Sequence, residues 1–413
     1  MDKVIFHIDV NSAFLSWEAV YRLKHGETLD LREIPSAVGG DREKRRGVIL
    51  AKSLSAKTFG VRTGESIAEA LRKCPELTVV PGNHALYEKC SAAFMKILRE
   101  YTPDVEQYSI DEAFLDMTGT EALFGPPLEV AHAIKDRIRD ELGFTVNVGI
   151  STNKLLAKMA SDFKKPDLVH TLFPEEIEKK MWPLPVGELF SVGKATVREL
   201  SKLGIRTIGE LAKYDPAVLS QHLKKQGEFI WRLANGIDSS LVESEPAANK
   251  CYGNSTTIAF DVTDAGTAKI VLLGLAETVA SRLRNNQVRA EVVSVGIRTH
   301  ELQHYSHQTV LDSPTNITQE LYQAAAKLFD EAWDGTPIRQ LGIQTGRLSE
   351  QGATRQLQLF DNTDYEKLER LDSAVDKIRK RFGNDAVKRA SFVMEEKLDH
   401  MPGKSSGENR TKK

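Results

Sequence analysis

Tyr108-Ser109-Ile110-Asp111-Glu112 places two adjacent carboxylates at the end of a short apolar stretch. A third carboxylate, Asp9, ends a separate apolar run near the N-terminus, Val4–Ile8. Because adjacent residues on a strand point to opposite faces, Asp111 and Glu112 can both face one site only near a turn. We therefore expect a hairpin tip at residues 108–112, beside a strand that carries Asp9.

Three carboxylates that converge on one site repel one another, so they need cations, and hard oxygen ligands suit Mg²⁺. Two such ions, roughly 3.5–4 Å apart, are a known device for in-line attack at phosphorus. The alternative is a solvated hairpin turn, which is the usual meaning of an isolated Asp-Glu pair. The motifs around this pair favour the metal site.

Six short motifs follow one another along the chain: Asp9–Phe14, Val38–Gly40, Phe59–Arg62, Tyr108–Phe114, Val148–Ser151 and Lys154–Asp162. Their order resembles that of the Y-family DNA polymerases, and of the DinB/UmuC group of translesion polymerases in particular. Any one motif is weak, whereas the ordered series is a strong signal. The resemblance runs from the first residues to about residue 360.

The resemblance implies an α+β multidomain fold. This is the right-hand polymerase, with palm, fingers, a helical thumb that carries a helix–hairpin–helix, and a small α/β little finger. The implied ranges are residues 1–30 and 76–166 for the palm, 31–75 for the fingers, 167–238 for the thumb, 250–348 for the little finger and 349–413 for a tail.

Length and composition describe an ordinary globular protein. The chain has 413 residues, of which 41% are hydrophobic and 28% charged, so two to four compact units are expected. No apolar run reaches the length of a membrane span, and the N-terminus lacks a signal-peptide pattern. Cys74, Cys90 and Cys251 are far apart and without CxxC spacing, which is typical of a reducing compartment and gives no zinc site. We expect a cytoplasmic monomer with no membrane contact.

The formal net charge of −2 does not by itself indicate DNA binding, because phosphate contacts need Lys and Arg. A polymerase of this charge must keep its acids at the metal site and its bases along the duplex. In the little-finger range we expect DNA contacts from backbone amides and from Arg282, Arg284 and Arg289.

Apolar periodicity predicts the main elements. Strand-like runs over 4–8, 47–51, 110–117 and 145–150 alternate with helical stretches over 84–101 and 128–142. We expect antiparallel strands with helices on one face. After a polar linker over 236–252, the order is a strand over 255–260, a helix over 265–285, a strand over 292–298, a helix over 318–333 and a strand over 338–348.

A Val-Gly-Lys turn, Val192-Gly193-Lys194, precedes a helix that ends near residue 203, and a second helix begins near residue 207. This pattern predicts a helix–hairpin–helix. Backbone N–H groups at such a turn lie beside a helix N-terminus, where a phosphate oxygen of DNA is well placed. The alternative is a tight turn between two packed helices.

The resemblance also implies the roles of the site residues. Asp9 and Asp111 should ligate both Mg²⁺ ions, the Val10 carbonyl should add a ligand, and Glu112 should complete the ion nearest the primer 3′-hydroxyl. One ion then lowers the pKa of that hydroxyl, and the other holds the triphosphate. Lys165 matches the family lysine that reaches the triphosphate.

Two positions concern nucleotide selection. Phe14 falls at the steric-gate position, where a bulky ring under the sugar excludes a ribose 2′-hydroxyl, and Ala13 stands where the family usually has an aromatic residue. Leu54 and Lys57 replace the Tyr and Arg that usually touch the triphosphate in the DinB branch. Lys57 keeps the charge without the bidentate fork, a pattern closer to the UmuC branch.

A short peptide after the little-finger range resembles the ligand of the bacterial sliding clamp. In Gln356-Leu357-Gln358-Leu359-Phe360 the glutamine would anchor while Leu357, Leu359 and Phe360 would fill an apolar pocket. The alternative is that this peptide packs on its own chain. Apolar residues at helical spacing over 368–382 predict an amphipathic helix, and residues 402–413 are expected to be disordered.

The function expected from these residues is error-prone, template-directed DNA synthesis past damaged bases, with primer-template DNA and deoxynucleoside triphosphates as substrates. One alternative is a nucleotidyl or diguanylate cyclase, which also places metal carboxylates on a palm-like sheet. Such enzymes lack a helix–hairpin–helix and a clamp peptide. The other alternative is a non-catalytic, polymerase-like DNA-binding accessory protein of the damage response.

Overall fold

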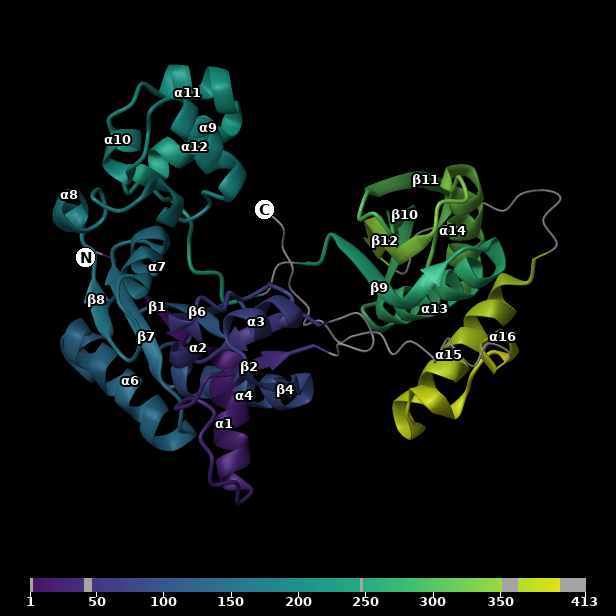
Figure 1. The fold of residues 1–413 in the computed structure, drawn as a ribbon, viewed down its shortest axis with the longest axis horizontal. Helices are drawn as coiled ribbons and strands as arrows, with labels where there is room; N and C mark the ends of the chain where they lie inside the picture. Colours follow the sequence, from purple (N-terminus) through teal and green to yellow (C-terminus); the bar gives the residue numbers. More distant parts are fainter. Residues whose placement is uncertain (1–2, 41–46, 246–247, 351–362, 394–413) are drawn as a thin grey trace. The chain divides into compact units, whose positions relative to one another are not determined.

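The computed structural model describes residues 3–40, 47–245, 248–350 and 363–393. These residues form two compact units, one of residues 3–40 with 48–245 and one of residues 248–350 with 363–393 (Figure 1). The clamp-like peptide and the C-terminal residues 402–413 lie outside the described residues.

The first unit is built on a five-stranded sheet of order β5-β6-β1-β7-β8. Strand β1 lies at its centre and pairs antiparallel with β6 and β7, so that Asp9 faces Glu112 on one side and Asn147 on the other. β7 and β8 pair in parallel, which corrects the expected all-antiparallel sheet. The strands are β1 (Ile5–Val10), β5 (Val105–Gln107), β6 (Glu112–Asp116), β7 (Val146–Ser151) and β8 (Val169–Thr171).

Helices cover both faces of this sheet, whereas one covered face was expected. Alternate residues of β1 (Phe6, Ile8 and Val10) join a large core with residues of α1 (Ala13–Lys24), α4 (His84–Leu98) and α6 (Pro127–Leu142). On the opposite face, Ile5 packs with Ala157 of α7 (Lys154–Asp162). The pleat therefore sends His7 and Asp9 to the side of α7.

Gly149 on β7 explains how closely α7 approaches the sheet. A Cβ atom at this position would lie 1.9 Å from the carbonyl oxygen of Ala157. Only glycine accommodates this approach, which brings the side chains of α7 over β1.

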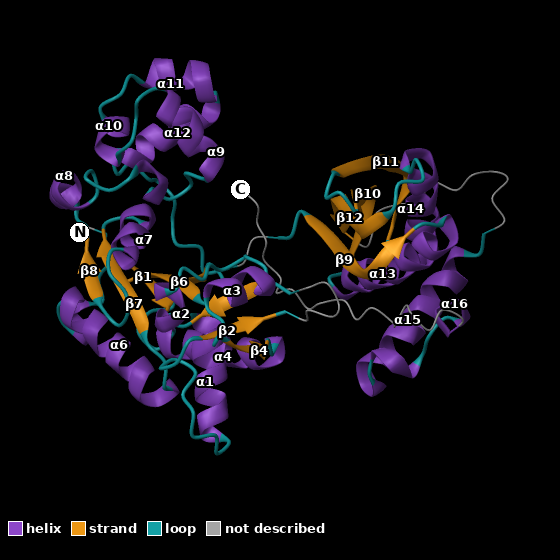
Figure 2. Cartoon of the chain, in the orientation of Figure 1, coloured by secondary structure: helices purple, strands orange, loops and turns teal. Residues whose placement is uncertain are grey.

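The first unit also contains a second, three-stranded sheet of order β3-β2-β4 (Figure 2). Its small core contains Ala37, Ile49 and Val61. The elements are β2 (Ser36–Gly39), β3 (Ile49–Lys52), α2 (Leu54–Thr58), α3 (Ile67–Lys73) and β4 (Thr78–Pro81). A short helix, α5 (Glu121–Phe124), follows β6.

The last part of the first unit is helical and shares a core with α7. The expected helix–hairpin–helix pair is present as α9 and α10. The expected palm ended at residue 166. The five-stranded sheet extends beyond that residue, because its last strand is β8. The elements are η1 (Pro174–Glu176), α8 (Ile177–Lys180), η2 (Val186–Glu188), α9 (Lys194–Lys202), α10 (Ile208–Ala212), α11 (Pro216–Leu223) and α12 (Lys225–Ala234).

The second unit has a four-stranded antiparallel sheet of order β11-β10-β12-β9 whose core includes α13 and α14. The five elements expected over 255–348 are present in the expected order, but β11 was missed because this edge strand is mostly exposed and polar. The elements are β9 (Cys251–Val262), α13 (Ala265–Asn285), β10 (Val288–Thr299), β11 (His304–Thr315), α14 (Thr318–Ala332), β12 (Ile338–Glu350), α15 (Tyr365–Phe382), η3 (Asn384–Ala386) and α16 (Ala390–Val393).

Helix α15 is part of this unit and not a free tail. Asp372 and Asp376 pair with Arg284, and Glu369 pairs with Arg289. These two arginines therefore lie within the unit's own ion pairs, which corrects our expectation that they contact DNA. Arg282 donates a hydrogen bond to the Gly253 carbonyl.

Candidate active site

The expected hairpin tip is present between β5 and β6. The N–H groups of Tyr108 and Ser109 both donate to the Glu112 carbonyl, at 3.0 and 3.2 Å, and so reverse the chain. The Val10 N–H donates to the Asp111 carbonyl at 3.0 Å, which fixes the tip beside the end of β1. Asp111 therefore lies next to Asp9 even though 102 residues separate them in sequence.

A cavity of about 250 Å³ opens at this point, between the two sheets of the first unit. One wall carries Asp9 and Asp111, and the other is formed by β3 and the loop before α3. The lining residues are Asp9, Val10, Ser12, Ala13, Phe14, Leu50, Ala51, Lys52, Thr63 and Asp111.

Asp9 and Asp111 share an environment that disfavours negative charge. Burial raises the pKa of Asp9 to about 6, although the ammonium group of Lys165 opposes the shift. Burial also raises the pKa of Asp111, against a 2.6 Å hydrogen bond from the Ser109 hydroxyl. Each of the two carboxylates would be stabilised by a cation in the cavity.

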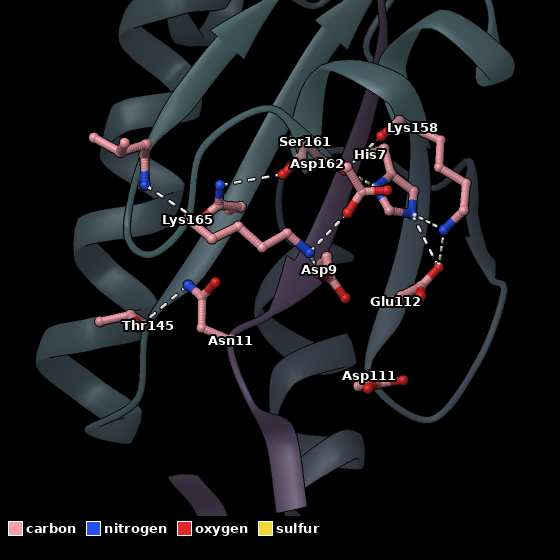
Figure 3. A network of polar contacts seen from close by, with 12 residues as sticks. His7, Asp9, Asn11, Asp111, Glu112, Thr145, Lys158, Ser161, Asp162 and Lys165 are labelled. Carbon is pink, nitrogen blue, oxygen red and sulfur yellow. Dashed lines mark hydrogen bonds and ion pairs between the residues drawn. The ribbon is translucent and has the colours of Figure 1, made fainter. Parts of the chain in front are cut away.

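Lys165, three residues after the end of α7, extends its side chain to Asp9, as Figure 3 shows. Its ammonium group binds the Asp9 carboxylate and also lies 2.9 Å from Asp162. Burial acts to lower the pKa of Lys165, but Asp9 and Asp162 outweigh it and raise the pKa. The expected triphosphate lysine is therefore charged and beside the site.

Glu112 is held away from the other two acids by a separate network (Figure 3). Lys158 donates to its Oε2 atom, and His7 Nε2 lies 3.2 Å from the same oxygen. The other ring nitrogen of His7 lies 2.7 Å from the Ser161 hydroxyl. Burial acts to raise the pKa of Glu112, but His7 and Lys158 outweigh it and lower the pKa to about 2.

The sequence did not identify His7 or Lys158 as site residues. His7 is buried, and burial lowers its pKa to about 4, so its ring is neutral at pH 7. The alternation in Phe6-His7-Ile8-Asp9 was the available signal, since it places His7 on the same face as Asp9.

Phe14 lines the cavity with its ring held in place from behind. The ring stacks on Tyr87 at 4.6 Å between centroids and 12° between planes. Tyr87 is itself fixed by a 2.9 Å hydrogen bond from its hydroxyl to Glu18. The ring of Phe14 is therefore a rigid part of the cavity wall.

Leu54 and Lys57 both lie on α2, outside the cavity lining, and Leu54 is exposed. Lys52, at the end of β3, lines the cavity from the side of the three-stranded sheet. Sequence reasoning missed Lys52, although Leu50 and Lys52 share one face of a short strand.

The residues expected to bind DNA lie at the start of α9. Val192 is buried, Gly193 is the N-cap residue and Lys194 is exposed. Gly193 provides no side-chain cap, so the first N–H groups of α9 have no side-chain partner at this cap. The residues expected to bind the clamp, Gln356, Leu357, Leu359 and Phe360, lie outside the described residues.

The acids at the cavity are the groups that could hold a metal ion. Among the described residues, no three His, Cys, Asp or Glu side chains come close enough together to hold one ion, because Glu112 is turned to Lys158 and His7. Asp9 and Asp111 nevertheless line one cavity as hard oxygen donors with raised pKa values. This chemistry fits a divalent cation held by these two residues.

Among the described helices, none combines the length and apolar character needed to span a bilayer.

Three family models match the sequence. The impB/mucB/samB family matches residues 8–162, the IMS family HHH motif matches residues 174–205, and the impB/mucB/samB family C-terminal domain matches residues 249–359. The first and last of these ranges contain the carboxylates and the four-stranded sheet.

Relatives match over nearly the whole chain. DNA polymerase IV of Clostridium acetobutylicum is 47% identical over 96% of this chain and 100% of its own length. DNA polymerase IV 2 of Bacillus subtilis is 40% identical over 95% of each chain. A solved Y-family DNA polymerase chimera has the same fold, with a TM-score of 0.72 and 23% identity over 84% of this chain and 99% of its own.

Proposed function

The chain belongs to the impB/mucB/samB family of Y-family DNA polymerases, and from that premise we propose how it copies damaged templates. It is a DNA-directed DNA polymerase of the translesion type, acting on primer-template DNA and deoxynucleoside triphosphates. Our proposal is that it extends a primer 3′-hydroxyl past damaged bases at the cavity of Asp9 and Asp111.

The observation that carries the proposal is this cavity, with two buried acids on one wall and a fixed aromatic ring beside them. Both acids have raised pKa values, so their ionised forms would be stabilised by a cation in the cavity.

Enzymes of this family use divalent metal ions, and we propose two Mg²⁺ ions here. Asp9 and Asp111, with the Val10 carbonyl, would hold them, and Glu112 would add a ligand by turning from Lys158. When bound, the ions supply acidity to the primer hydroxyl and neutralise charge on the phosphates. Lys165 lies beside Asp9 and can reach a triphosphate oxygen as a point charge.

The remaining parts of the proposal concern DNA binding, a second contact to the triphosphate, the domain ranges and the sliding clamp. The amides at Val192, Gly193 and Lys194 would bind a phosphate of the duplex at the start of α9. Lys57, on exposed α2, would approach the triphosphate from outside the cavity. The palm, fingers, thumb and little finger would follow the ranges given above, in a monomer that the peptide at 356–360 tethers to a sliding clamp.

Primer extension on an undamaged template and on one with an abasic site tests the proposal. We expect extension on both in Mg²⁺ and none in EDTA. Asp111→Ala should reduce extension by at least about a hundredfold while primer-template affinity stays within about twofold, because DNA contacts lie elsewhere. Extension that stops at the abasic site would refute damage bypass, and full extension by Asp111→Ala would refute the metal assignment.

A further inference from the structure

The cavity has walls of opposite charge. Asp9 and Asp111 form one wall, and Lys52 projects from the end of β3 on the other. Lys52 is held on its strand by main-chain pairing to Ala37, and Ser53, the buried N-cap residue of α2, follows it directly. Its position is thus set by two elements and not by a mobile loop.

The ammonium group of Lys52 has a neutral partner. It donates to the Thr63 hydroxyl at 3.3 Å, and among the described residues no carboxylate forms an ion pair with it. Glu65 is in the same loop, but its carboxylate binds Lys73 and accepts the Arg62 N–H at 2.8 Å. Glu65 therefore forms its ion pair with Lys73 and acts on Lys52 only at longer range, where it opposes but does not outweigh the effects of burial and Lys57 on the Lys52 pKa.

The strand β3 and the loop run side by side, which is why Lys52 and Thr63 meet. The Gly64 N–H donates to the Ile49 carbonyl at 2.8 Å, and the Ile49 N–H donates to the Glu65 carbonyl at 2.9 Å. Thr63 also lines the cavity, so its hydroxyl holds the ammonium group at the cavity wall.

We propose that Lys52 binds the polyphosphate of the incoming nucleotide, with Thr63 as the residue that positions its ammonium group. The proposal rests on the function proposed above and deepens it, because it names a phosphate contact on β3 in addition to the expected one on α2. Lys57, the expected contact, does not line the cavity.

Phosphate is the ligand that fits this cation. Burial lowers the pKa of Lys52, and the positive charge of Lys57 lowers it further, so an anion beside Lys52 relieves both costs. An ammonium group is a compact point charge that matches phosphate oxygens without a fixed fork geometry. A nucleobase edge would satisfy one donor and leave the charge uncompensated.

The test is nucleotide binding without chemistry. A primer that ends in a dideoxynucleotide forms the complex with polymerase, template and Mg²⁺ but cannot react, so the Kd of each correct deoxynucleotide can be measured directly. Lys52→Gln should raise the Kd of all four nucleotides by about tenfold, the loss of one charge-assisted hydrogen bond. Lys52→Arg should restore most of the affinity, and Thr63→Val should raise Kd by about threefold.

Inorganic tripolyphosphate separates phosphate from base recognition. It should compete with nucleotide in the wild type and about tenfold less well in Lys52→Gln. Lys89→Gln, an exposed lysine on α4, is the matched control and should leave both values unchanged. Unfolding midpoints equal to that of the wild type show that the variants are folded, and Thr63→Val provides a second route if Lys52→Gln is not.

Two outcomes overturn the inference. They are an unchanged Kd in Lys52→Gln and a change confined to one base. Failure of the proposed function is distinct, because the wild type would then fail to extend an ordinary primer.

Discussion

At the scale of single residues, Asp9 and Glu112 face each other across β1 and β6, yet their pKa values move in opposite directions. Burial raises the pKa of Asp9 to about 6, and Lys165 offsets only part of that shift. Glu112 is also buried, but His7 and Lys158 lower its pKa to about 2. Glu112 is therefore ionised throughout the neutral range, whereas a proton competes for Asp9 near pH 6.

Lys158→Met should change the pH dependence of nucleotide addition. Without the ammonium group, Glu112 loses an ion pair that lowers its pKa, so its pKa rises and the carboxylate is protonated at a higher pH. We expect the acid limb of the kcat profile to move towards neutral pH. The measurement is the rate of single-turnover primer extension at pH values from about 5 to about 9.

Lys154→Met is the matched control for this prediction. Lys154 lies one turn earlier on α7 and pairs with Glu106, which is not a site residue. Its pH profile should match that of the wild type. An acid limb that stays in place in Lys158→Met would show that Lys158 does not set the charge of Glu112 in the working enzyme.

Phe14→Ala should relax sugar selection. The ring is stacked on Tyr87 and cannot swing away without losing that contact, so it forms a fixed obstacle to a 2′-hydroxyl. Removing it should raise ribonucleotide incorporation relative to deoxynucleotide incorporation by at least about tenfold. Competition between the two nucleotide types on one primer measures the ratio, and an unchanged ratio with normal deoxynucleotide extension would contradict the gate.

At the scale of elements, α15 completes the second unit through polar contacts. The N-cap residue of α14, Ile317, has no side-chain acceptor, and the Thr318 N–H instead donates to Asp372 of α15 at 2.8 Å. Asp372 also pairs with Arg284, and both side chains are nearly buried. The Asp372 carboxylate on α15 thus caps the N-terminus of α14 and also neutralises the nearly buried Arg284.

Asp372→Ala should therefore destabilise the second unit by about 3–5 kcal/mol, since it leaves Arg284 partly unpaired in a buried site. Hydrogen exchange should show lost protection in the first turn of α14. Asp330→Ala, which breaks an exposed pair with Lys269, is the control and should cost no more than about 1 kcal/mol. Equal effects of the two substitutions would mean that α15 does not support the unit.

At the scale of the whole molecule, the net charge is small although 28% of the residues are charged. A net charge of −2 leaves little general attraction for DNA, and two arginines of the second unit are already neutralised by α15. A tether to a sliding clamp, as proposed above, would raise the local concentration of enzyme at the primer end without needing a large positive charge on the chain.

Replacing both Leu359 and Phe360 by Ala should remove stimulation by the sliding clamp and leave clamp-free extension unchanged. Burial of the two side chains in a pocket contributes about 1.5–3 kcal/mol each, enough to abolish clamp binding at working concentrations. The measurement is extension with and without clamp on one purified variant. A lower melting temperature with reduced basal activity would instead show that the peptide packs on its own chain.

Local sequence pattern was sufficient for part of this protein. Alternation and helical periodicity predicted the order of most elements in the second unit, and in the first unit β1, β3, β6, β7, α4 and α6. The turn at Asp111-Glu112 and the strand before Asp9 predicted three acids at one site, of which Asp9 and Asp111 line the cavity. These features are readable because the side-chain period of a strand or a helix decides which residues share a face. β11 was missed for the same reason, because its exposed, polar residues carry no such pattern.

Only the tertiary structure decided which charges meet. Lys158 reaches Glu112 across 46 residues, Asp372 caps α14 across 54, and Lys52 reaches the carboxylate cavity from a different sheet. None of these pairings has a local sequence signal, since each requires two elements to pack at a particular distance. The close approach of α7 at Gly149 is what brings Lys158 over β1. Packing therefore set the electrostatics of the site, because ionic contacts act at distances that the fold alone defines.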